Sequence, residues 1–238
     1  AGNYAQMNGY HSQIFEMGDQ PGGLCTAWRR KGYTIDGCIH WLVGSSPKSS
    51  LHRLWSEVGL MQGRQFVDLD QYMRFEGAGG RTFIIYTDVN QLEQHMLELS
   101  PDDAAITHRL IDGIRLGIAY DRLQVLQSDS KLQRALKRAR MGLLMVRKAQ
   151  DLQYWLRTTT EQFADRFADP LIRQALLEMW FPEFSMFFVL FTLAYLHNRN
   201  AGYPLGGSLP MAQAMEKRYL GLGGQIHYRS KVEKILVE

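Results

Sequence analysis

The stretch that decides the fold is residues 12–28, SQIFEMGDQPGGLCTAW. Its first part, residues 12–16 (SQIFE), predicts a short strand that ends in an acid, Glu16, and a turn-rich segment follows at residues 17–26. The residues before it, 1–9 (AGNYAQMNG), are typical of the tail of a helix, with Gly9 where a glycine ends the helix. A helix that leads into such a strand is half of a βαβ unit, so this opening predicts an α/β fold.

The far end of the chain carries a related pattern. Residues 227–228 and 232–237 predict strands, and this strand pattern continues up to the end of the sequence. The opening helix has no strand before it, so we expect the chain to be a piece of a longer protein. We also expect the strand that ends in Glu16 to leave one edge unpaired.

Between these ends the sequence predicts a hairpin and then helices. Residues 65–75 and 81–86 are rich in β-formers and flank residues 76–80 (EGAGG), a hairpin signal. Asp88 is suited to cap the first of several helices. These helices are expected near residues 91–99, 101–116, 130–157, 159–167, 170–179 and 184–198, with a further helix near 209–220.

The order of these elements predicts one nucleotide-binding fold that is interrupted by a second domain. The first part of that fold would comprise residues 1–62, and its second part residues 202–238. Residues 63–201 would form the inserted domain, a hairpin followed by helices. We expect this insert to be the better packed half, because its contacts are mostly internal.

The composition excludes several classes of protein. The chain has 238 residues, of which 45% are hydrophobic and 21% charged, and this excludes a disordered tail, a collagen-like fibre and a long coiled coil. The net charge, 27 − 24 = +3, is too small to indicate a nucleic-acid partner. Cys25 and Cys38 are not spaced as C-x-x-C and favour a reducing, cytoplasmic location. The longest apolar run, residues 186–196, is shorter than the about 20 residues of a membrane span.

Two features of the opening stretch suit nucleotide binding. An acid at the end of a strand hydrogen-bonds ribose hydroxyls in dinucleotide-binding units, and Glu16 stands at such a place; a solvated strand end is the alternative. Gly22 and Gly23 would let the backbone approach a bulky ligand closely, although a simple surface turn also explains them. The histidines lack the spacing of zinc ligands, so no metal site is predicted.

Taken together, five segments resemble a known family. They are Glu16, residues 21–28 (PGGLCTAW), 32–44 (GYTIDGCIHWLVG), 202–215 (GYPLGGSLPMAQAM) and 223–238 (GGQIHYRSKVEKILVE). In this order they resemble the phytoene desaturase-like FAD-dependent oxidoreductases, the carotenoid desaturase and retinol saturase group, which is related to the flavin amine oxidases. The resemblance implies a truncated Rossmann-like FAD-binding domain interrupted by a hairpin and a mainly helical substrate domain. The family's G-x-G-x-x-G and its C-terminal part would lie outside this chain.

The resemblance also implies roles for single residues. Glu16 would accept hydrogen bonds from the adenosine ribose of FAD. Gly22, Gly23 and Leu24 would offer backbone groups to the middle of the cofactor. Val232 would offer its backbone N–H and C=O to the adenine edge, although an ordinary valine of a β-core is equally consistent with the pattern.

The implied activity is hydride transfer between the flavin and an apolar substrate. The substrate would be polyene- or isoprenoid-like and would be desaturated, saturated or isomerised. His40 is a candidate catalytic residue, but the flavin itself carries hydride chemistry, so a packing role is the alternative. Residues 206–208 would form a close-approach turn that returns from the substrate domain. Two alternatives stay open: a non-enzymatic lipid or prenyl carrier of the same fold, and a flavin amine oxidase.

Two further segments point to apolar partners. Residues 131–148 hold seven basic residues and no acid, with leucines at helical spacing, which favours peripheral contact with an anionic membrane; a solvated cationic face is the alternative. Residues 179–195 (MWFPEFSMFFVLFTLAY) are rich in aromatic residues and methionine. They could line an apolar substrate tunnel or form a buried core helix.

Overall fold

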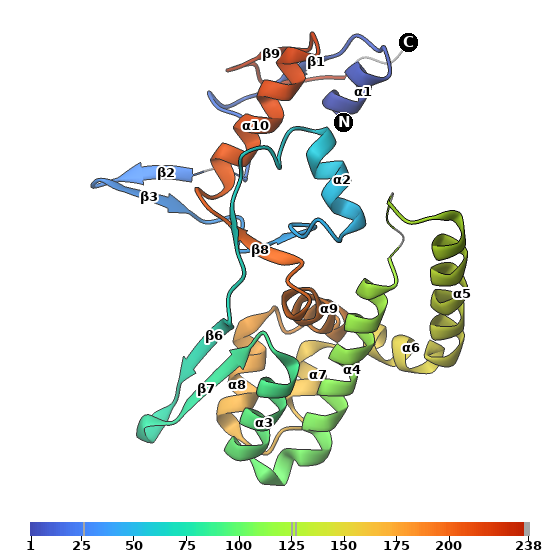
Figure 1. Ribbon diagram of the computed structural model, residues 1–238. Helices are drawn as coiled ribbons and strands as arrows, with labels where there is room; N and C mark the ends of the chain where they lie inside the picture. The colour runs from blue at the N-terminus through green and yellow to red at the C-terminus, as the bar shows by residue number, and fades with distance from the viewer. Residues whose placement is uncertain (26, 125, 127, 236–238) are drawn as a thin grey trace. The chain divides into compact units, whose positions relative to one another are not determined.

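A computed structural model describes residues 1–25, 27–124, 126 and 128–235, and the chain divides into two compact units (Figure 1). Unit 1 comprises Ala1–Pro47, Leu51–Val67 and Gly202–Glu238, and unit 2 comprises Lys48–Ser50 and Asp68–Ala201. The chain therefore leaves unit 1, builds most of unit 2, and returns. The mixture of helix and strand that the sequence predicts is confirmed. The assignment of residues 1–62 and 202–238 to one functional domain and of residues 63–201 to another stays a prediction.

Unit 1 is built from short elements. Wholly or for the most part it holds α1 (Gly2–Met7), β1 (Gln13–Phe15), β2 (Ala27–Arg30), β3 (Tyr33–Asp36), β4 (Leu42–Val43), α2 (Ser50–Glu57), β5 (Phe66–Val67), β8 (Ala201–Pro204), α10 (Ser208–Gly221) and β9 (Gln225–His227). β2 and β3 form an antiparallel ribbon, and β8 lies between β4 and β5 in a three-stranded sheet. Several segments far apart in sequence therefore meet in this unit.

The two ends of the chain meet in a parallel pair of strands. β1 lies beside β9 (Figure 1), and the register of the pair sets Ile14 opposite Ile226. Beyond the strands, the Ser230 N–H donates to the Glu16 carbonyl over 2.8 Å. The Tyr219 hydroxyl of α10 donates to the carbonyl of Ser12 over 2.6 Å, just before β1. β1 follows α1 and β9 follows α10, as expected of βαβ-like connections.

One predicted strand is wrong in the residues that the structure describes. Residues 232–235 have no regular secondary structure, and residues 236–237 lie outside the described residues. Val232 and Ile235 are the apolar residues of this stretch, and their side chains are 57% and 80% exposed. Residues that favour β-structure form a stable strand only where a neighbour pairs with it and covers one face.

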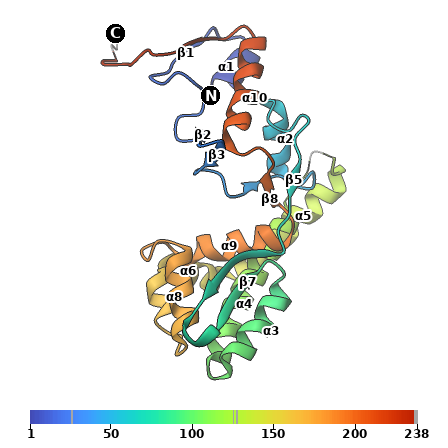
Figure 2. The ribbon, with the colours of Figure 1, turned by 90° about the vertical axis from the view of Figure 1, so that its left-hand side faces the viewer.

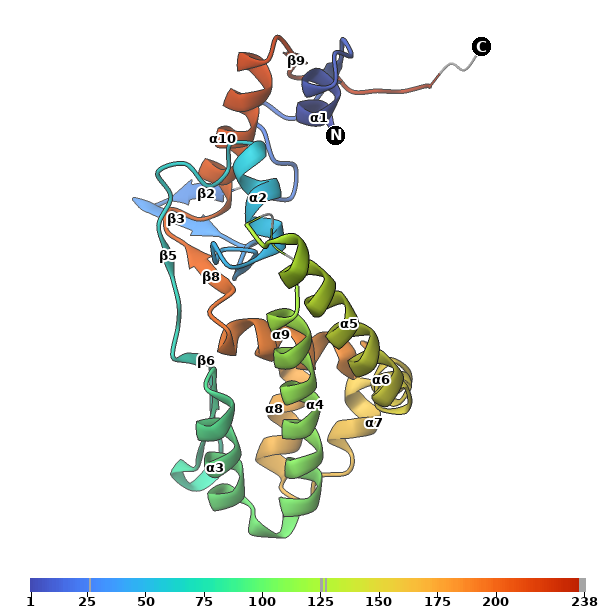
Figure 3. The same ribbon diagram turned by 45° about the vertical axis from the view of Figure 1, so that its right-hand side comes forward.

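Unit 2 opens with two antiparallel strands and continues as helices (Figures 2 and 3). β6 (Gln71–Glu76) pairs with β7 (Thr82–Tyr86) across the turn η1 (Ala78–Gly80), and β7 lies beside α3. The helical elements are α3 (Val89–Leu99), η2 (Pro101–Asp103), α4 (Ala104–Arg122), α5 (Lys131–Arg147), α6 (Ala149–Arg157), α7 (Thr160–Ala164), α8 (Pro170–Met179) and α9 (Met186–His197).

Local signals explain where several of these helices begin. Asp88 accepts hydrogen bonds from the backbone N–H groups of Asn90 and Gln91, so its predicted role as the cap of α3 is confirmed. Ser130 and Gln133 form a capping box at the start of α5. The helix predicted to end near residue 116 continues to Arg122, because its buried face continues through Leu116 and Ile118.

The core of unit 2 depends on close contact between α4 and α9. A Cβ atom added at Gly113 would lie 2.8 Å from Leu190 Cδ1, and one added at Gly117 would lie 2.8 Å from Ala194 Cβ. The two glycines therefore let the helices approach closely. The sequence leaves two roles open for residues 179–195, a tunnel lining or a core helix. The inward side of α9, which belongs to this segment, is core, with Val189 and Ala194 fully buried. Most of the fully buried side chains in the described residues belong to unit 2, as the sequence predicts.

Asp103 joins two loops of this core. Its buried carboxylate accepts hydrogen bonds from the Ala168 N–H (2.8 Å), the Asp169 N–H (2.9 Å) and the Ser100 hydroxyl (2.8 Å). Burial alone would raise the pKa of Asp103, but these hydrogen bonds outweigh it and hold the pKa below its ordinary value.

We predict that Asp103→Ala lowers the free energy of unfolding by about 3 kcal/mol, since hydrogen bonds to a charged group contribute about 1.5–3 kcal/mol each and are not additive. Urea unfolding of the full chain measures the loss. Asp102→Ala, at the exposed neighbouring carboxylate, is the control and should change stability by less than about 0.5 kcal/mol. Equal effects of the two substitutions would contradict the assigned role of Asp103.

The lowered pKa of the Asp103 carboxylate predicts that the stability of the folded protein depends on pH. The pKa of Asp103 is lowered in the folded state relative to an unfolded value of about 3.9. Its contribution to stability is therefore complete above about pH 5 and is lost as pH falls through the folded pKa. Unfolding of the wild type and of Asp103→Ala should converge in stability as the solution is acidified. A constant difference between them down to acidic pH would show that the charge does not matter.

Candidate functional site

Unit 1 holds an apolar cavity of about 640 Å³. Its walls come from α1, β1, α2 and α10, together with the loops around residues 21–25 and 39–42. Leu42, Val58, Leu60 and Met211 form a small buried cluster against it, and Trp55 packs on that cluster. A cavity of this size with an apolar lining and few polar groups is typical of a small-molecule or cofactor site.

Glu16 brings a carboxylate to this cavity. It directly follows β1, and its Oε1 accepts a hydrogen bond from the Gly18 N–H over 2.6 Å. A carboxylate has about four lone-pair positions, so this bond leaves capacity to accept from a ligand's hydroxyl groups. The residue therefore has both the place and the chemistry to recognise a polyol such as ribose.

A second polar pair lines the same cavity. The Tyr228 hydroxyl donates a hydrogen bond to the carboxylate of Glu216 on α10. Burial raises the pKa of Tyr228, and the Glu216 hydrogen bond and the nearby charges of Glu216 and Glu16 raise it further. Tyr228 therefore keeps its proton at neutral pH and acts as a hydrogen-bond donor.

Asn3 contributes an acceptor that has no partner of its own. Its side chain is 8% exposed, and its Nδ2 donates to the Met215 carbonyl over 3.1 Å. Its Oδ1 has no hydrogen-bond partner within the described ranges, and Asn3 lines the cavity. Buried polar atoms are nearly always paired, so this oxygen is available to a donor group of a ligand or of a water molecule in the cavity.

Glycine is required where the loop after β1 meets α10. Gly22 has φ +113°, and a Cβ added there would lie 2.4 Å from the Cys25 carbonyl oxygen and 2.9 Å from Ala212 Cβ. The Cys25 N–H donates to the Gly22 carbonyl over 2.8 Å, which closes a tight turn. The absence of a side chain at Gly22 is therefore what brings this backbone against α10 and the cavity.

Asp36 fixes the start of α10. Its carboxylate accepts from the Ser208 N–H and, over 2.7 Å, from the Ser208 hydroxyl. The Ser208 hydroxyl in turn accepts from the Ile39 N–H over 3.1 Å. Gly207 has φ +75°, and any Cβ there would collide with the Asp36 carboxylate. Burial would raise the pKa of Asp36, but the hydrogen bonds from Ser208, Cys38 and Ile39 lower it, so the carboxylate is ionised at neutral pH.

The structure gathers only some of the residues predicted to contact the cofactor. Glu16 and Gly22 line the cavity. Gly23, Leu24 and Val232 are not part of its lining, and the Leu24 and Val232 side chains are 94% and 57% exposed. Their proposed contacts through the backbone stay predictions.

His40, the candidate catalytic residue, is exposed and lies beside Trp41, with ring centroids 6.0 Å apart. It does not line the cavity either. Residues 206–208 do form a turn of close approach, with positive φ at Gly206 and Gly207. Their role in cofactor binding stays a prediction.

Sequence reasoning missed two polar residues of the cavity lining, Asn3 and Tyr228, and it missed Asp36, which fixes the start of α10. Asn3, Asp36 and Tyr228 each act through a partner far away in sequence or in another element. The Asp36-Gly37 pair is a local turn signal, but nothing local indicates that its carboxylate caps a helix that begins at Ser208.

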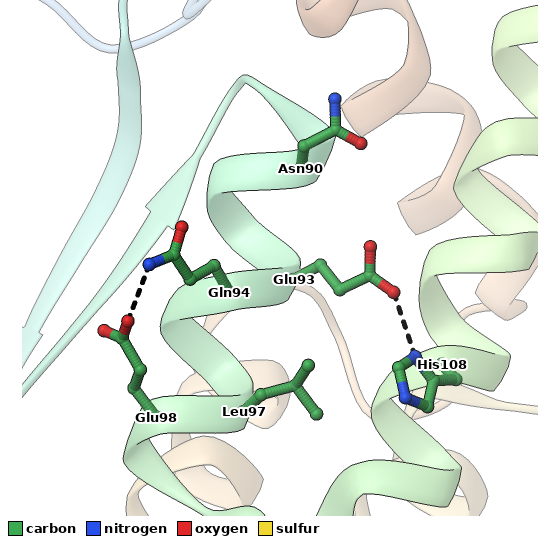
Figure 4. A pocket seen from close by; sticks show the side chains of 6 residues that line it. All are labelled: Asn90, Glu93, Gln94, Leu97, Glu98 and His108. Carbon is green, nitrogen blue, oxygen red and sulfur yellow. Dashed lines mark hydrogen bonds and ion pairs between the residues drawn. The ribbon is translucent and has the colours of Figure 1, made fainter.

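Unit 2 carries a separate hollow of about 450 Å³ between α3 and α4 (Figure 4). Glu93 accepts from Arg115 (2.6 Å) and lies 2.9 Å from His108 Nδ1. Burial would raise the pKa of Glu93, but its contacts with His108 and Arg115 lower it. Both carboxylate oxygens therefore serve to tie the two helices together, which is a structural role.

Two searches of the described residues found nothing. No group of three or more His, Cys, Asp or Glu side chains there could hold a metal ion. In the same part of the chain, each helix is too short or too polar to cross a bilayer.

Comparison with known proteins gives two findings. Residues 3–238 match the family model described as flavin containing amine oxidoreductase. The phytoene desaturase (lycopene-forming) of Pseudescherichia vulneris is 24% identical over 257 aligned positions. The alignment covers 98% of this chain and 46% of that relative, so the chain spans about half the length of the curated relative that it matches.

The turn at Gly22 gives a test of the site's geometry. Gly23 has φ +55° but open space around it, so Gly23→Ala should cost only the left-handed backbone penalty of about 1–2 kcal/mol. Gly22→Ala adds a collision with the Cys25 carbonyl and should lower the free energy of unfolding by about 3 kcal/mol. Urea unfolding of both variants measures the difference. A Gly22→Ala variant as stable as Gly23→Ala would contradict the close approach.

Proposed function

Because the chain belongs to the flavin-containing amine oxidoreductase family, we propose that it is part of an FAD-dependent oxidoreductase whose FAD-binding domain is unit 1. The observation that carries this proposal is Glu16 at the end of β1, at an apolar cavity. In dinucleotide-binding folds an acid at this place binds the ribose hydroxyls. The parallel pairing of β1 with β9, each after a helix, supports a Rossmann-like arrangement.

The residues of the cavity fit FAD in chemistry. Glu16 supplies an acceptor for ribose hydroxyls, and the Oδ1 of Asn3 supplies an unpaired acceptor for a donor group. Gly22 keeps side-chain atoms away from a bulky ligand, and the apolar wall suits a ring system. Bound FAD would supply the acceptor or donor of hydride.

The residues themselves hold and shield the cofactor. Glu16 accepts hydrogen bonds from the ribose hydroxyls and so orients the ribose. Tyr228 keeps its proton and donates to Glu216, which fixes the polar edge of the cavity. Trp55 and Met211 exclude water from the apolar side.

For the substrate we propose an apolar, polyene- or isoprenoid-like molecule that is desaturated, saturated or isomerised. The support is a row of phenylalanines in unit 2. Phe181, Phe184 and Phe188 are 66%, 40% and 56% exposed, and neighbouring ring centroids lie 5.1 and 6.1 Å apart. Exposed aromatic groups of this kind mark binding surfaces for apolar ligands. They favour this substrate over the polar amine of an amine oxidase, and the Glu16 site favours an enzyme over a carrier.

We also propose that the protein is cytoplasmic and that its helix α5 contacts the surface of an anionic membrane. Leu132 and Val146 on this helix are 79% and 77% exposed, and Arg138 and Arg140 are exposed as well. Lys137 is different, because it forms an ion pair with Asp129 at 2.8 Å. An exposed helix with cationic and apolar residues is suited to the interface of an acidic bilayer.

Glu16→Gln should weaken FAD binding by about 10- to 100-fold, since a hydrogen bond to a charged group is worth about 1.5–3 kcal/mol. Quenching of flavin fluorescence on titration of the protein with FAD measures the affinity. Asp19→Asn removes the same charge at an exposed position nearby and should leave the affinity unchanged. If Glu16→Gln binds FAD as tightly as the wild type, Glu16 is not in the site.

Reversing the charge of α5 tests the membrane proposal. Arg138→Glu with Arg140→Glu should reduce sedimentation with acidic phospholipid vesicles, and added salt should do the same, because exposed charges are screened within about 10 Å at 0.1 M ionic strength. Lys217→Glu with Lys231→Glu is the matched control at exposed positions of unit 1. Equal sedimentation of wild type with neutral and acidic vesicles would show that α5 is only a solvated face.

A further inference from the structure

Cys25 and Cys38 lie at the open end of the β2–β3 ribbon, one before β2 and one after β3. The ribbon pairs Trp28 with Ile35 and Ala27 with Asp36. Cys25 lies two residues before Ala27 in the sequence, and Cys38 lies two residues after Asp36. A disulfide requires Cα atoms about 4.4–6.8 Å apart, and the strands of an antiparallel pair hold opposite residues at about 4.5–5.5 Å, so the end of such a ribbon brings the flanking residues near this range.

The two thiols are in contact. The structure leaves both cysteines free of a disulfide, and the Cys25 thiol lies within hydrogen-bonding reach of the Cys38 thiol. Burial raises the pKa of Cys25, and the contact with Cys38 raises it further. Cys38 is exposed, whereas Cys25 is half-buried.

The backbone on both sides of the pair is held in place. The Cys25 N–H donates to Gly22, and the Cys38 N–H donates to Asp36 Oδ1 over 3.0 Å. Asp36 is itself bound to Ser208 at the start of α10. The cysteines are therefore presented to each other by two anchored turns.

We propose that Cys25 and Cys38 form a redox-sensitive pair that closes reversibly to an intrachain disulfide when a peroxide is present. The disulfide would join the segment before β2 to the segment after β3 and fix the turn that begins at Gly22. Cys25 also lines the cavity, so the modification would act at its wall. The proposal does not depend on FAD binding.

The exposed Cys38 reacts first. Its thiolate attacks one oxygen of hydrogen peroxide, an S–O bond forms, the O–O bond breaks, and the departing hydroxide takes a proton to become water. The Cys25 sulfur then attacks the Cys38 sulfenic acid. The S–S bond forms as the S–O bond breaks, and the leaving hydroxide takes the Cys25 proton. In sum, two thiols lose two electrons and two protons, and one peroxide becomes two molecules of water.

Peptide mapping tests the disulfide directly. The full chain is treated with hydrogen peroxide, its remaining thiols are blocked with N-ethylmaleimide, and it is digested with trypsin without reductant. Cleavage after Arg29 and Lys31 separates the two cysteines, because Cys25 then lies in residues 1–29 and Cys38 in residues 32–48. We expect these peptides to be joined, with the mass of two hydrogens lost, and to be released by dithiothreitol.

The order of attack is tested with single variants and a sulfenic acid trap such as dimedone. In Cys25→Ser, Cys38 should be trapped after peroxide treatment, whereas in Cys38→Ser, Cys25 should stay a thiol. Trapping at Cys25 instead would overturn the assignment of Cys38 as the attacking residue. Recovery of both wild-type cysteines as separate maleimide adducts or separate oxidised acids, or as a disulfide between two chains, would overturn the proposed pair.

Discussion

Unit 1 depends on the contact between the Asp36 carboxylate and the first residue of α10. The N-terminus of a helix carries unpaired N–H groups and a partial positive charge, so an ionised carboxylate is stabilising there. Asp36 reaches this helix across 172 residues of sequence and binds both the N–H and the hydroxyl of Ser208. α10 leads into β9, and β9 pairs with β1, which Glu16 directly follows. The contact therefore also helps to position Glu16 at the cavity.

The two units differ in what stabilises them. Unit 2 has its own core, in which α9 packs closely on Gly113 and Gly117 of α4. Unit 1 has a small buried cluster around Leu42 and Met211, and much of its apolar surface faces a cavity instead. A ligand that fills such a cavity stabilises the folded state by mass action, so cofactor binding and the stability of unit 1 are linked.

The sequence predicted those features that arise from neighbouring residues. Asp88 before α3 and Pro170 at the start of α8 are local helix signals, and both helices begin where these residues indicate. The site was predicted only in part, through Glu16 and Gly22. Asp36, Asn3 and Tyr228 were missed because their partners lie in other elements. A strand at residues 232–235 was predicted wrongly because residues that favour β-structure do not by themselves supply a pairing neighbour. Short-range patterns determine where elements form, whereas long-range hydrogen bonds determine which side chains share a site.

The visible absorption spectrum of the full-length protein, purified without added cofactor, is the most direct test of unit 1 as an FAD-binding domain. The cavity predicts a yellow protein with the absorption bands of oxidised flavin, from which heat or acid releases FAD into the supernatant, because the contacts described are non-covalent. A colourless protein that gains no protein-bound flavin absorbance when FAD is added would contradict the account and favour a carrier of the same fold.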